Sequence, residues 1–139
     1  MQHVKKINWG ILGLGNIAHK FAEDLILVDD AKIISVASSS IDRAKIFSKK
    51  FKVKNSYDSY QKLINDEEID VIYIASINTL HMKWTIKSLE KGKAVLCEKP
   101  LAMKPVDVKK MIATSVKNNV FLMEALWSRF NPSISKVKE

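Results

Sequence analysis

The chain alternates between short apolar runs and longer stretches in which apolar residues recur at helical spacing. The apolar runs have the length of strands and cover residues 7–12, 32–37, 71–75, 94–97 and 120–123. A further short extended piece is expected at residues 53–57. Continuous apolar runs of this length are typical of parallel strands that are buried on both faces.

The stretches between these runs predict helices over residues 17–28, 41–51, 60–65, 79–91 and 106–118. Asp58 is positioned to cap the third of these helices, Gly92 follows the fourth, and Pro105 precedes the last. Strands that alternate with helices in this way form βαβ units. The pattern therefore predicts an α/β fold, a doubly wound parallel sheet with helices on both faces in three αβα layers.

The alternation ends after Glu124. A chain of 139 residues supports one domain of ordinary size, and we expect that domain to cover residues 1–124. Residues 125–132 carry Trp127, Arg129 and Phe130, and a polar tail follows up to residue 139. We expect residues 125–139 to lie outside the sheet domain.

Composition and charge narrow the classes of partner. Apolar residues make up 47% of the chain and charged residues 27%, as in soluble globular proteins. No apolar stretch approaches the roughly 18 residues of a membrane span, and the first apolar run leads into glycines rather than a cleavage site. We therefore predict no membrane partner and no signal peptide.

The net charge of +8 raises the alternative of a nucleic-acid partner. The lysines are spread along the chain, however, without a basic block or interleaved aromatic residues. We interpret the charge as a solvated lysine-rich surface, whose positive field would also attract an anionic ligand. No nucleic-acid partner is expected.

Cys97 is the only cysteine, so no internal disulfide can form, which fits a reducing, cytoplasmic location. Its position at the end of an apolar run favours a small buried residue over a reactive thiol. The histidines at positions 3, 19 and 81 do not have the spacing of metal ligands, so no metal site is predicted.

The first apolar run closes on the turn Gly13-Leu14-Gly15-Asn16-Ile17-Ala18. In such a turn the first glycine permits the tight bend, the second lets the backbone approach a phosphate, and a small third residue lets the helix pack on the strand. The backbone N–H groups near Asn16 and Ile17 would face the anion. Because the pattern follows a predicted strand and opens a predicted helix, we interpret it as a dinucleotide site. The alternative is a tight turn that binds nothing.

The end of the second predicted strand indicates which dinucleotide binds. Sites that prefer NAD place an acidic residue there, about 20 residues beyond the turn. This chain instead has Ser38, Ser39 and Ser40, with Arg43 close behind. Hydroxyl groups and a guanidinium suit a 2′-phosphate, so we predict NADP in preference to NAD. The alternative interpretations are a helix N-cap for Ser40 and a solvent-facing side chain for Arg43.

Further motifs follow on later elements of the pattern. They are Ala75-Ser76-Ile77-Asn78-Thr79-Leu80-His81, Glu98-Lys99-Pro100 and Trp127-Ser128-Arg129-Phe130. With the glycine turn, they resemble the family of glucose–fructose oxidoreductase, inositol dehydrogenase and MocA. The stretch 124–132 is most similar to the dihydrodiol dehydrogenase and NADP-dependent xylose dehydrogenase branch. The resemblance covers the chain from about Ile7 onward.

This resemblance implies a Rossmann domain that binds NAD(P). It also implies that Lys99 lies beside the nicotinamide and the substrate and aids hydride transfer to or from a sugar, polyol or dihydrodiol carbon. Glu98 is implied as a cofactor-side residue and Pro100 as a residue that shapes the loop.

Other positions take cofactor-lining roles by the same resemblance, namely Ala75, Asn78 and His81 after one strand and Trp127 and Arg129 in the last motif. Family members continue into a second domain that builds the substrate pocket, so residues 125–139 would begin the connection to it. The apolar residues that such a domain covers predict a homo-oligomer for this chain.

Two positions depart from the family pattern. Ile77 stands where many members have proline, and Ser39 stands where members that use NADP often have arginine. The interpretation of a 2′-phosphate site therefore depends on Arg43.

Each candidate also has a plainer interpretation. Lys99 would be a solvated lysine, His81 a surface residue at a helix start, and Trp127 with Phe130 part of the core under the sheet. A rival function is a non-catalytic module that binds the dinucleotide and acts through partner contacts. The intact Glu98-Lys99-Pro100 motif favours an enzyme.

Overall fold

The computed structural model describes residues 6–137, so the N-terminal His3 and Lys5 and the last two residues lie outside the described part. Six parallel strands form one sheet in the order β3-β2-β1-β4-β5-β6. The strands are β1 (Ile7–Leu12), β2 (Ala31–Ala37), β3 (Asn55–Tyr57), β4 (Val71–Ile74), β5 (Ala94–Cys97) and β6 (Leu122–Glu124). The predicted α/β fold with a doubly wound parallel sheet is confirmed.

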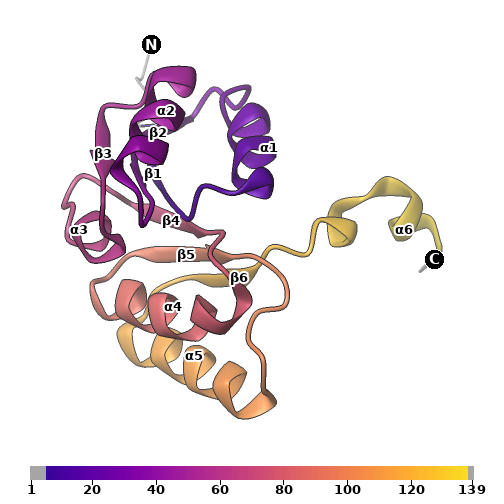
Figure 1. Cartoon of the computed structure of the whole chain (residues 1–139). Helices are drawn as coiled ribbons and strands as arrows, with labels where there is room; N and C mark the ends of the chain where they lie inside the picture. Colours follow the sequence, from indigo (N-terminus) through magenta and orange to yellow (C-terminus); the bar gives the residue numbers. More distant parts are fainter. Residues whose placement is uncertain (1–5, 138–139) are drawn as a thin grey trace.

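Helices cover both faces of this sheet, as Figure 1 shows. They are α1 (Asn16–Leu25), α2 (Ile41–Phe51), α3 (Tyr60–Ile64), α4 (His81–Glu90), α5 (Pro105–Asn118) and α6 (Pro132–Val137), with short 3-10 turns η1 (Asn78–Leu80) and η2 (Trp127–Phe130). Helices α1 and α2 pack on one face, and α3 and α4 pack on the other. Helix α5 packs beside α4, whereas η2 and α6 extend away from the sheet (Figure 1).

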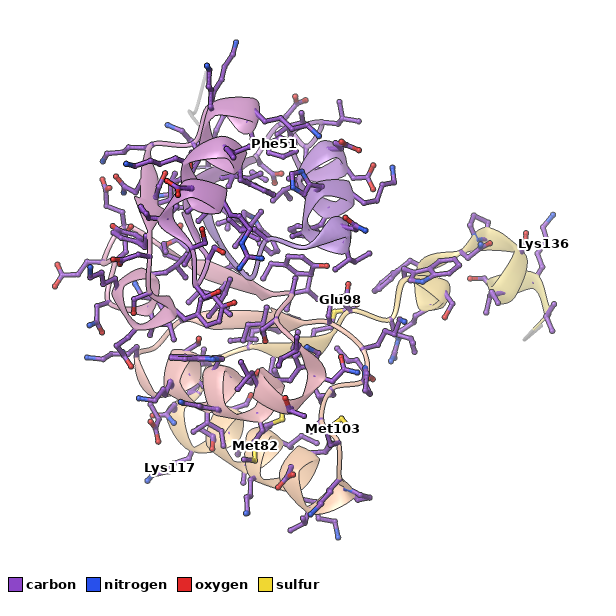
Figure 2. The ribbon with its side chains drawn as sticks, in the orientation of Figure 1. Phe51, Met82, Glu98, Met103, Lys117 and Lys136 are labelled. Carbon is purple, nitrogen blue, oxygen red and sulfur yellow. The ribbon has the colours of Figure 1, made fainter. Side chains whose placement is uncertain are left out.

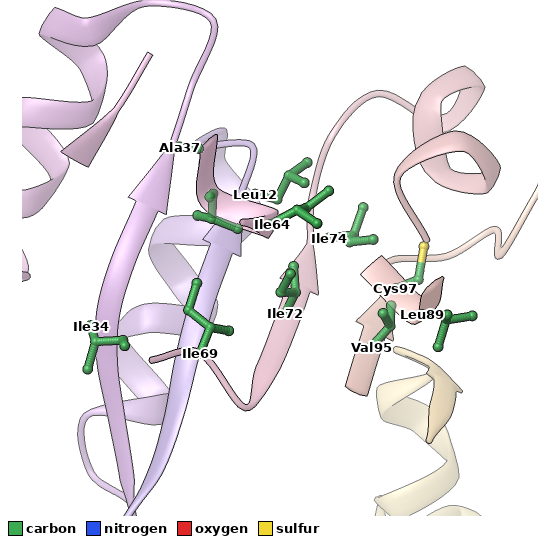
Figure 3. Packing of buried hydrophobic residues seen from close by; sticks show 11 residues of the cluster. Leu12, Ile34, Ala37, Ile64, Ile69, Ile72, Ile74, Leu89, Val95 and Cys97 are labelled. Carbon is green, nitrogen blue, oxygen red and sulfur yellow. The ribbon is translucent and has the colours of Figure 1, made fainter. Parts of the chain in front are cut away.

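Neighbouring residues of each central strand belong to different cores. Ile11 and Tyr73 pack with α1 and α2 in one cluster, whereas Leu12, Ile72 and Ile74 pack with α3 and α4 in the other. Figure 3 shows the second cluster from close by, with Leu12 at the end of β1 and Ile72 and Ile74 on β4. Because both faces are buried, the central strands carry consecutive apolar residues, such as Ile11-Leu12 in β1 and Val71–Ile74 in β4, rather than an apolar residue at every second position.

The carboxyl ends of the strands meet at one edge of the sheet, and β1 lies at the point where the strand order reverses. The chain goes from β1 outward to β2 and β3, and then returns to β4 on the other side of β1. Two backbone hydrogen bonds extend the pairing beyond β1: Gly13 N–H donates to the Ala37 carbonyl at 3.0 Å, and Ala75 N–H donates to the Leu12 carbonyl at 2.8 Å. In open α/β sheets, ligands bind in the crevice at such a switch point.

Some boundaries differ from the predicted ones for local reasons. Helix α1 ends at Leu25, and the exposed Ile26–Val28 segment forms a turn in which Val28 N–H donates to the Leu25 carbonyl. Ser59, not Asp58, caps α3: its hydroxyl accepts from Gln61 N–H at 3.2 Å. Asp58 instead pairs with Lys62 on the next turn, at 2.8 Å.

The segment after Glu124 contains the 3-10 turn η2 and the helix α6. Its placement outside the sheet is visible in Figure 1. Within residues 6–137, none of the helices combines the length and the apolar character that crossing a bilayer requires.

Candidate dinucleotide site

Gly13 occupies a backbone conformation that side chains rarely adopt. Its φ is +89°, and a Cβ atom there would lie 2.7 Å from backbone atoms of Ala75 and Ser76. The left-handed conformation and the close contact each exclude a side chain. Gly13 therefore allows the loop after β4 to lie directly against the loop after β1.

Gly15 has a different reason to be glycine. A Cβ atom at this position would meet nothing within 4 Å, and the residue has an ordinary extended φ of −80°. The folded chain itself thus leaves the space beside Gly15 open, which is the condition for close approach of a ligand to the backbone.

The start of α1 next to this space is exposed. No side chain caps the helix, and Asn16 and Ile17 are both exposed in its first turn. The first N–H groups of a helix have no partner within the helix, so they are available to an anion at this position. Ala18 is fully buried, as expected for the small residue that lets the helix pack on the sheet.

The end of β2 has the predicted hydroxyl groups, but they have separate tasks. The Ser38 side chain is only 3% exposed, and its hydroxyl accepts from Ser40 N–H at 3.3 Å, so Ser38 braces the turn and does not face solvent. Ser40 caps α2 by accepting from Arg43 N–H at 3.4 Å, as its alternative interpretation predicts. Ser39 is exposed, and its hydroxyl accepts from the Arg43 guanidinium at 3.0 Å. Ser39 and Arg43 thus form an exposed, hydrogen-bonded polar pair at this strand end.

The loop after β4 is tied to the loop after β5 by His81. The His81 side chain is fully buried, with Nδ1 2.8 Å from the Pro100 carbonyl oxygen and Nε2 3.0 Å from the Ser76 carbonyl oxygen. The interpretation of His81 as a surface residue is therefore wrong, and in this conformation the ring has no exposed surface for a cofactor. Asn78, at the start of η1, is exposed, and Ala75 is half-buried against Gly13.

Glu98 is oriented by a buried tyrosine. The Tyr73 hydroxyl donates to Glu98 Oε1 at 2.6 Å, and the Tyr73 ring stacks on Phe21 of α1 with ring centres 3.8 Å apart. Burial, and then the hydrogen bond to this carboxylate, raise the pKa of Tyr73 far above its ordinary value. Tyr73 therefore stays a neutral donor that holds one oxygen of Glu98. Figure 2 labels Glu98 near the point where the C-terminal segment leaves the sheet.

Lys99 is exposed at the end of β5, while its backbone is held in place. Its N–H donates to Glu98 Oε2 at 3.1 Å, and the Lys99–Pro100 peptide bond is cis. Beyond the proline, Leu101 N–H donates to Glu124 Oε1 at 2.8 Å. Within residues 6–137, the Lys99 ammonium forms no ion pair. The loop thus presents a free cation from a fixed backbone.

A groove of about 700 Å³ opens between α1 and the segment that follows β6. Its lining is mostly apolar and consists of Ile17, Lys20, Phe21, Asp24, Tyr73, Leu96, Glu98, Met123, Ala125, Leu126, Trp127 and Phe130. Ile17 belongs to the glycine turn and Glu98 to the Glu98-Lys99-Pro100 motif, so the groove is lined by one residue of each motif.

The aromatic residues of the last motif lie at the far wall of this groove. Trp127 is 71% exposed and Phe130 is 67% exposed, so the interpretation that they form core under the sheet is wrong. Trp127 lines the groove with Ile17 and Glu98, whereas Arg129 is exposed and is not among the lining residues.

Cys97 is a buried structural residue. Its side chain is fully buried, and burial raises the pKa of the thiol to about 12, so the thiolate is not available near neutral pH. Among residues 6–137, no three His, Cys, Asp or Glu side chains come together as a potential metal site.

Two residues of the site were not predicted as site residues from the sequence. Tyr73 is the one aromatic residue in an otherwise aliphatic strand, and Glu124 ends the last strand at the same sheet edge as Glu98. Both positions carry a signal, because a polar atom inside a buried strand needs a partner. The identity of that partner depends on the packing of loops that lie far apart in the sequence.

Comparison with known proteins agrees with this geometry. A family model described as an oxidoreductase family with an NAD-binding Rossmann fold matches residues 7–126. The trans-1,2-dihydrobenzene-1,2-diol dehydrogenase of Xenopus tropicalis is 39% identical over 132 residues, which cover 94% of this chain and 40% of that protein. The enzyme of the same name from Mus musculus is 37% identical over 135 residues, covering 96% and 40%. The chain thus spans about 40% of the length of the curated relatives it matches.

Solved structures share the fold. A 3-ketoreductase from Actinomadura kijaniata in complex with NADP superimposes with a TM-score of 0.92 at 27% identity, over 96% of this chain and 42% of that one. A probable dehydrogenase from Thermotoga maritima gives a TM-score of 0.90 at 31% identity, over 95% of this chain and 40% of that one. The predicted resemblance, including the dihydrodiol dehydrogenase branch, is confirmed.

Proposed function

The chain belongs to the glucose–fructose oxidoreductase, inositol dehydrogenase and MocA family of oxidoreductases, and from that premise we propose its part in the reaction. It forms the dinucleotide-binding part of an enzyme that transfers a hydride between a nicotinamide cofactor and a sugar, polyol or dihydrodiol carbon. Lys99 acts beside the reacting centre. The cofactor is NADP in preference to NAD.

One observation carries this proposal: a single groove is lined both by Ile17 of the glycine turn and by Glu98, the residue before Lys99. The turn offers what a pyrophosphate needs, namely open space beside Gly15 and the uncapped start of α1. Glu98 lines the same groove and precedes the exposed Lys99 in the chain. We expect a dinucleotide held at the glycine turn to extend toward Glu98 and Lys99.

The chemistry divides between the cofactor and the protein. A bound nicotinamide supplies the hydride acceptor or donor. The protein supplies orientation through the glycine turn and, through Lys99, a positive charge or a proton for the substrate oxygen. Glu98, held by the Tyr73 hydroxyl, fixes the Lys99 backbone rather than neutralising its ammonium.

The preference for NADP rests on the end of β2. The Arg43 guanidinium lies against the Ser39 hydroxyl, and the three residues between β2 and α2 are serines without a carboxylate. A guanidinium that is already oriented loses less side-chain entropy when it binds a phosphate.

Titration calorimetry of this chain with NADPH and with NADH tests the proposal. We expect both to bind and NADPH to bind more tightly, because the 2′-phosphate meets a cation and a hydroxyl donor. Equal affinities, or tighter binding of NADH, would count against the NADP preference. No binding of either dinucleotide would count against the function itself.

A further inference from the structure

His81 lies completely buried at the start of α4, and each of its ring nitrogens faces a backbone carbonyl. The two carbonyls belong to different loops. Ser76 follows β4, and its carbonyl oxygen is 3.0 Å from Nε2. Pro100 follows β5, and its carbonyl oxygen is 2.8 Å from Nδ1.

A carbonyl oxygen accepts hydrogen bonds and cannot donate them. Both contacts are hydrogen bonds only when each ring nitrogen carries a hydrogen. A ring with a single N–H would leave a nitrogen lone pair against a carbonyl oxygen in a fully buried place, which is unfavourable. A ring that donates from both sides is the imidazolium cation, so the two carbonyl oxygens also offset the cost of burying its positive charge. The geometry, with an acceptor at each nitrogen, favours this form.

The His81 ring joins two loops that both belong to the candidate dinucleotide site, the loop after β4 and the loop that carries Lys99. Ser76 and Ala75 are in direct contact with Gly13 of the glycine turn. Pro100 is the residue after Lys99, whose N–H is tied on the other side to Glu98. Backbone contacts and the His81 ring therefore connect the phosphate turn to the lysine loop without interruption.

We propose that His81 is a positioning residue that acts as a double donor and fixes the Lys99 loop relative to the glycine turn. The fully buried ring acts through the two loops and does not touch the cofactor. This inference rests on the proposed function only in one respect: the position of Lys99 matters because Lys99 is the proposed catalytic residue.

The first test is the protonation of the ring itself. In nitrogen-15 NMR spectra of the labelled chain at neutral pH, we expect two slowly exchanging ring N–H signals from His81, both absent from the His81→Phe variant. A single ring N–H signal from His81 would overturn the proposal. This measurement uses the unmodified chain for its main result, so it stands even when the variant does not fold.

The second test is amide hydrogen exchange in the loop. Leu101 N–H, which donates to Glu124, reports the order of the Lys99 loop, and Val95 N–H, which donates to the Phe121 carbonyl, reports the sheet. In His81→Phe we expect exchange at Leu101 to become about tenfold faster, the effect of losing roughly one hydrogen bond, while Val95 is unchanged.

The matched control is Ser88→Ala. Ser88 is equally buried on the same helix, but its hydroxyl donates to the Trp84 carbonyl within α4 and has no tie to the loop. Unchanged exchange at Leu101 in His81→Phe, or the same acceleration in Ser88→Ala, would overturn the proposal. Neither measurement requires a bound dinucleotide, so a failure of NADPH binding would leave both results interpretable.

Discussion

At the end of β2, the Arg43 guanidinium lies 3.0 Å from the Ser39 hydroxyl. We predict that Arg43→Ala weakens NADPH binding selectively, by about 1–3 kcal/mol, because a charge-assisted hydrogen bond to the 2′-phosphate is lost. NADH, which lacks this phosphate, should lose little affinity. Calorimetric titration of both cofactors measures the difference.

The control for this variant is Lys45→Ala, which removes an exposed cation from the same helix without a contact to Ser39. Its effect on NADPH affinity should be small, because distant surface charges are screened by salt. An equal loss in both variants would mean that the general positive field, and not Arg43, recognises the phosphate.

Lys99 differs from the other lysines by its place between Glu98 and Pro100, not by its exposure. We predict that Lys99→Ala, in a protein that spans the full length of the family members, lowers turnover by about 10²–10⁴ and changes cofactor affinity only a few-fold. The reason is that an ammonium at the substrate oxygen stabilises the transition state more than the bound ground state.

Steady-state kinetics with the Lys104→Ala variant supply the comparison for Lys99→Ala. Lys104 is exposed at the start of α5, five residues beyond Lys99 in the same connection between β5 and α5. Near-normal turnover in Lys99→Ala would mean that the Lys99 ammonium takes no part in the reaction and that the residue only contributes to the structure of the loop.

At the scale of the elements, the turn between β1 and α1 contains two glycines with opposite requirements. Gly13→Ala should destabilise the fold by about 2–4 kcal/mol, because the residue has a positive φ and a Cβ would press on the backbone of Ala75. Gly15→Ala should leave stability within about 1 kcal/mol, because the space beside it is open.

Gly15→Ala, which should hardly change stability, should instead weaken dinucleotide binding. Folded Gly15→Ala should bind NADPH about tenfold or more weakly, since its methyl group occupies the space that the pyrophosphate needs. Denaturant unfolding and calorimetry together separate the two effects. Unchanged affinity in Gly15→Ala would mean that no ligand approaches the backbone there.

The elements that the sequence predicted well are those that local pattern determines. The central strands contain consecutive apolar residues because helices cover both faces, and Gly13 is required by the backbone of its own turn. The caps were less predictable, since Asp58 and Ser59 are both good N-caps and neighbouring Lys62 decides between them.

The contacts within the site could not be predicted from the sequence. Tyr73 and Glu98 are 25 residues apart in the chain, yet a hydrogen bond joins their side chains, and His81 contacts a carbonyl oxygen 19 residues away. Motifs could assign these residues to one sheet edge. Only the packed loops determine that the histidine bridges backbone carbonyls instead of facing a ligand.

At the scale of the whole molecule, the site edge of the sheet is only partly enclosed. The groove has α1 and the ends of the strands on one side, but its other wall is the segment of Leu126, Trp127 and Phe130, which is largely exposed. A nicotinamide at this end would be open to water, whereas hydride transfer benefits from a closed site.

The chain itself should therefore bind a dinucleotide without oxidising polyols. The chain spans about 40% of the length of the curated relatives, and within residues 6–137 the groove that Glu98 lines stays open on the side of Trp127. Measurable NADP-dependent oxidation of a polyol by the purified 139-residue chain would contradict this expectation.

The same exposed wall should make the chain self-associate. Trp127 and Phe130 are 71% and 67% exposed beside an apolar groove, and contiguous apolar surface of this kind favours association. Sedimentation velocity should show dimers or larger species whose fraction rises with concentration.

Trp127→Ser combined with Phe130→Ser should shift the chain toward monomer, whereas Phe121→Ser, which changes a similarly exposed aromatic residue outside the groove, should not. A chain that stays monomeric at all concentrations, or one that Phe121→Ser dissociates equally well, would show that the groove is not the associating surface.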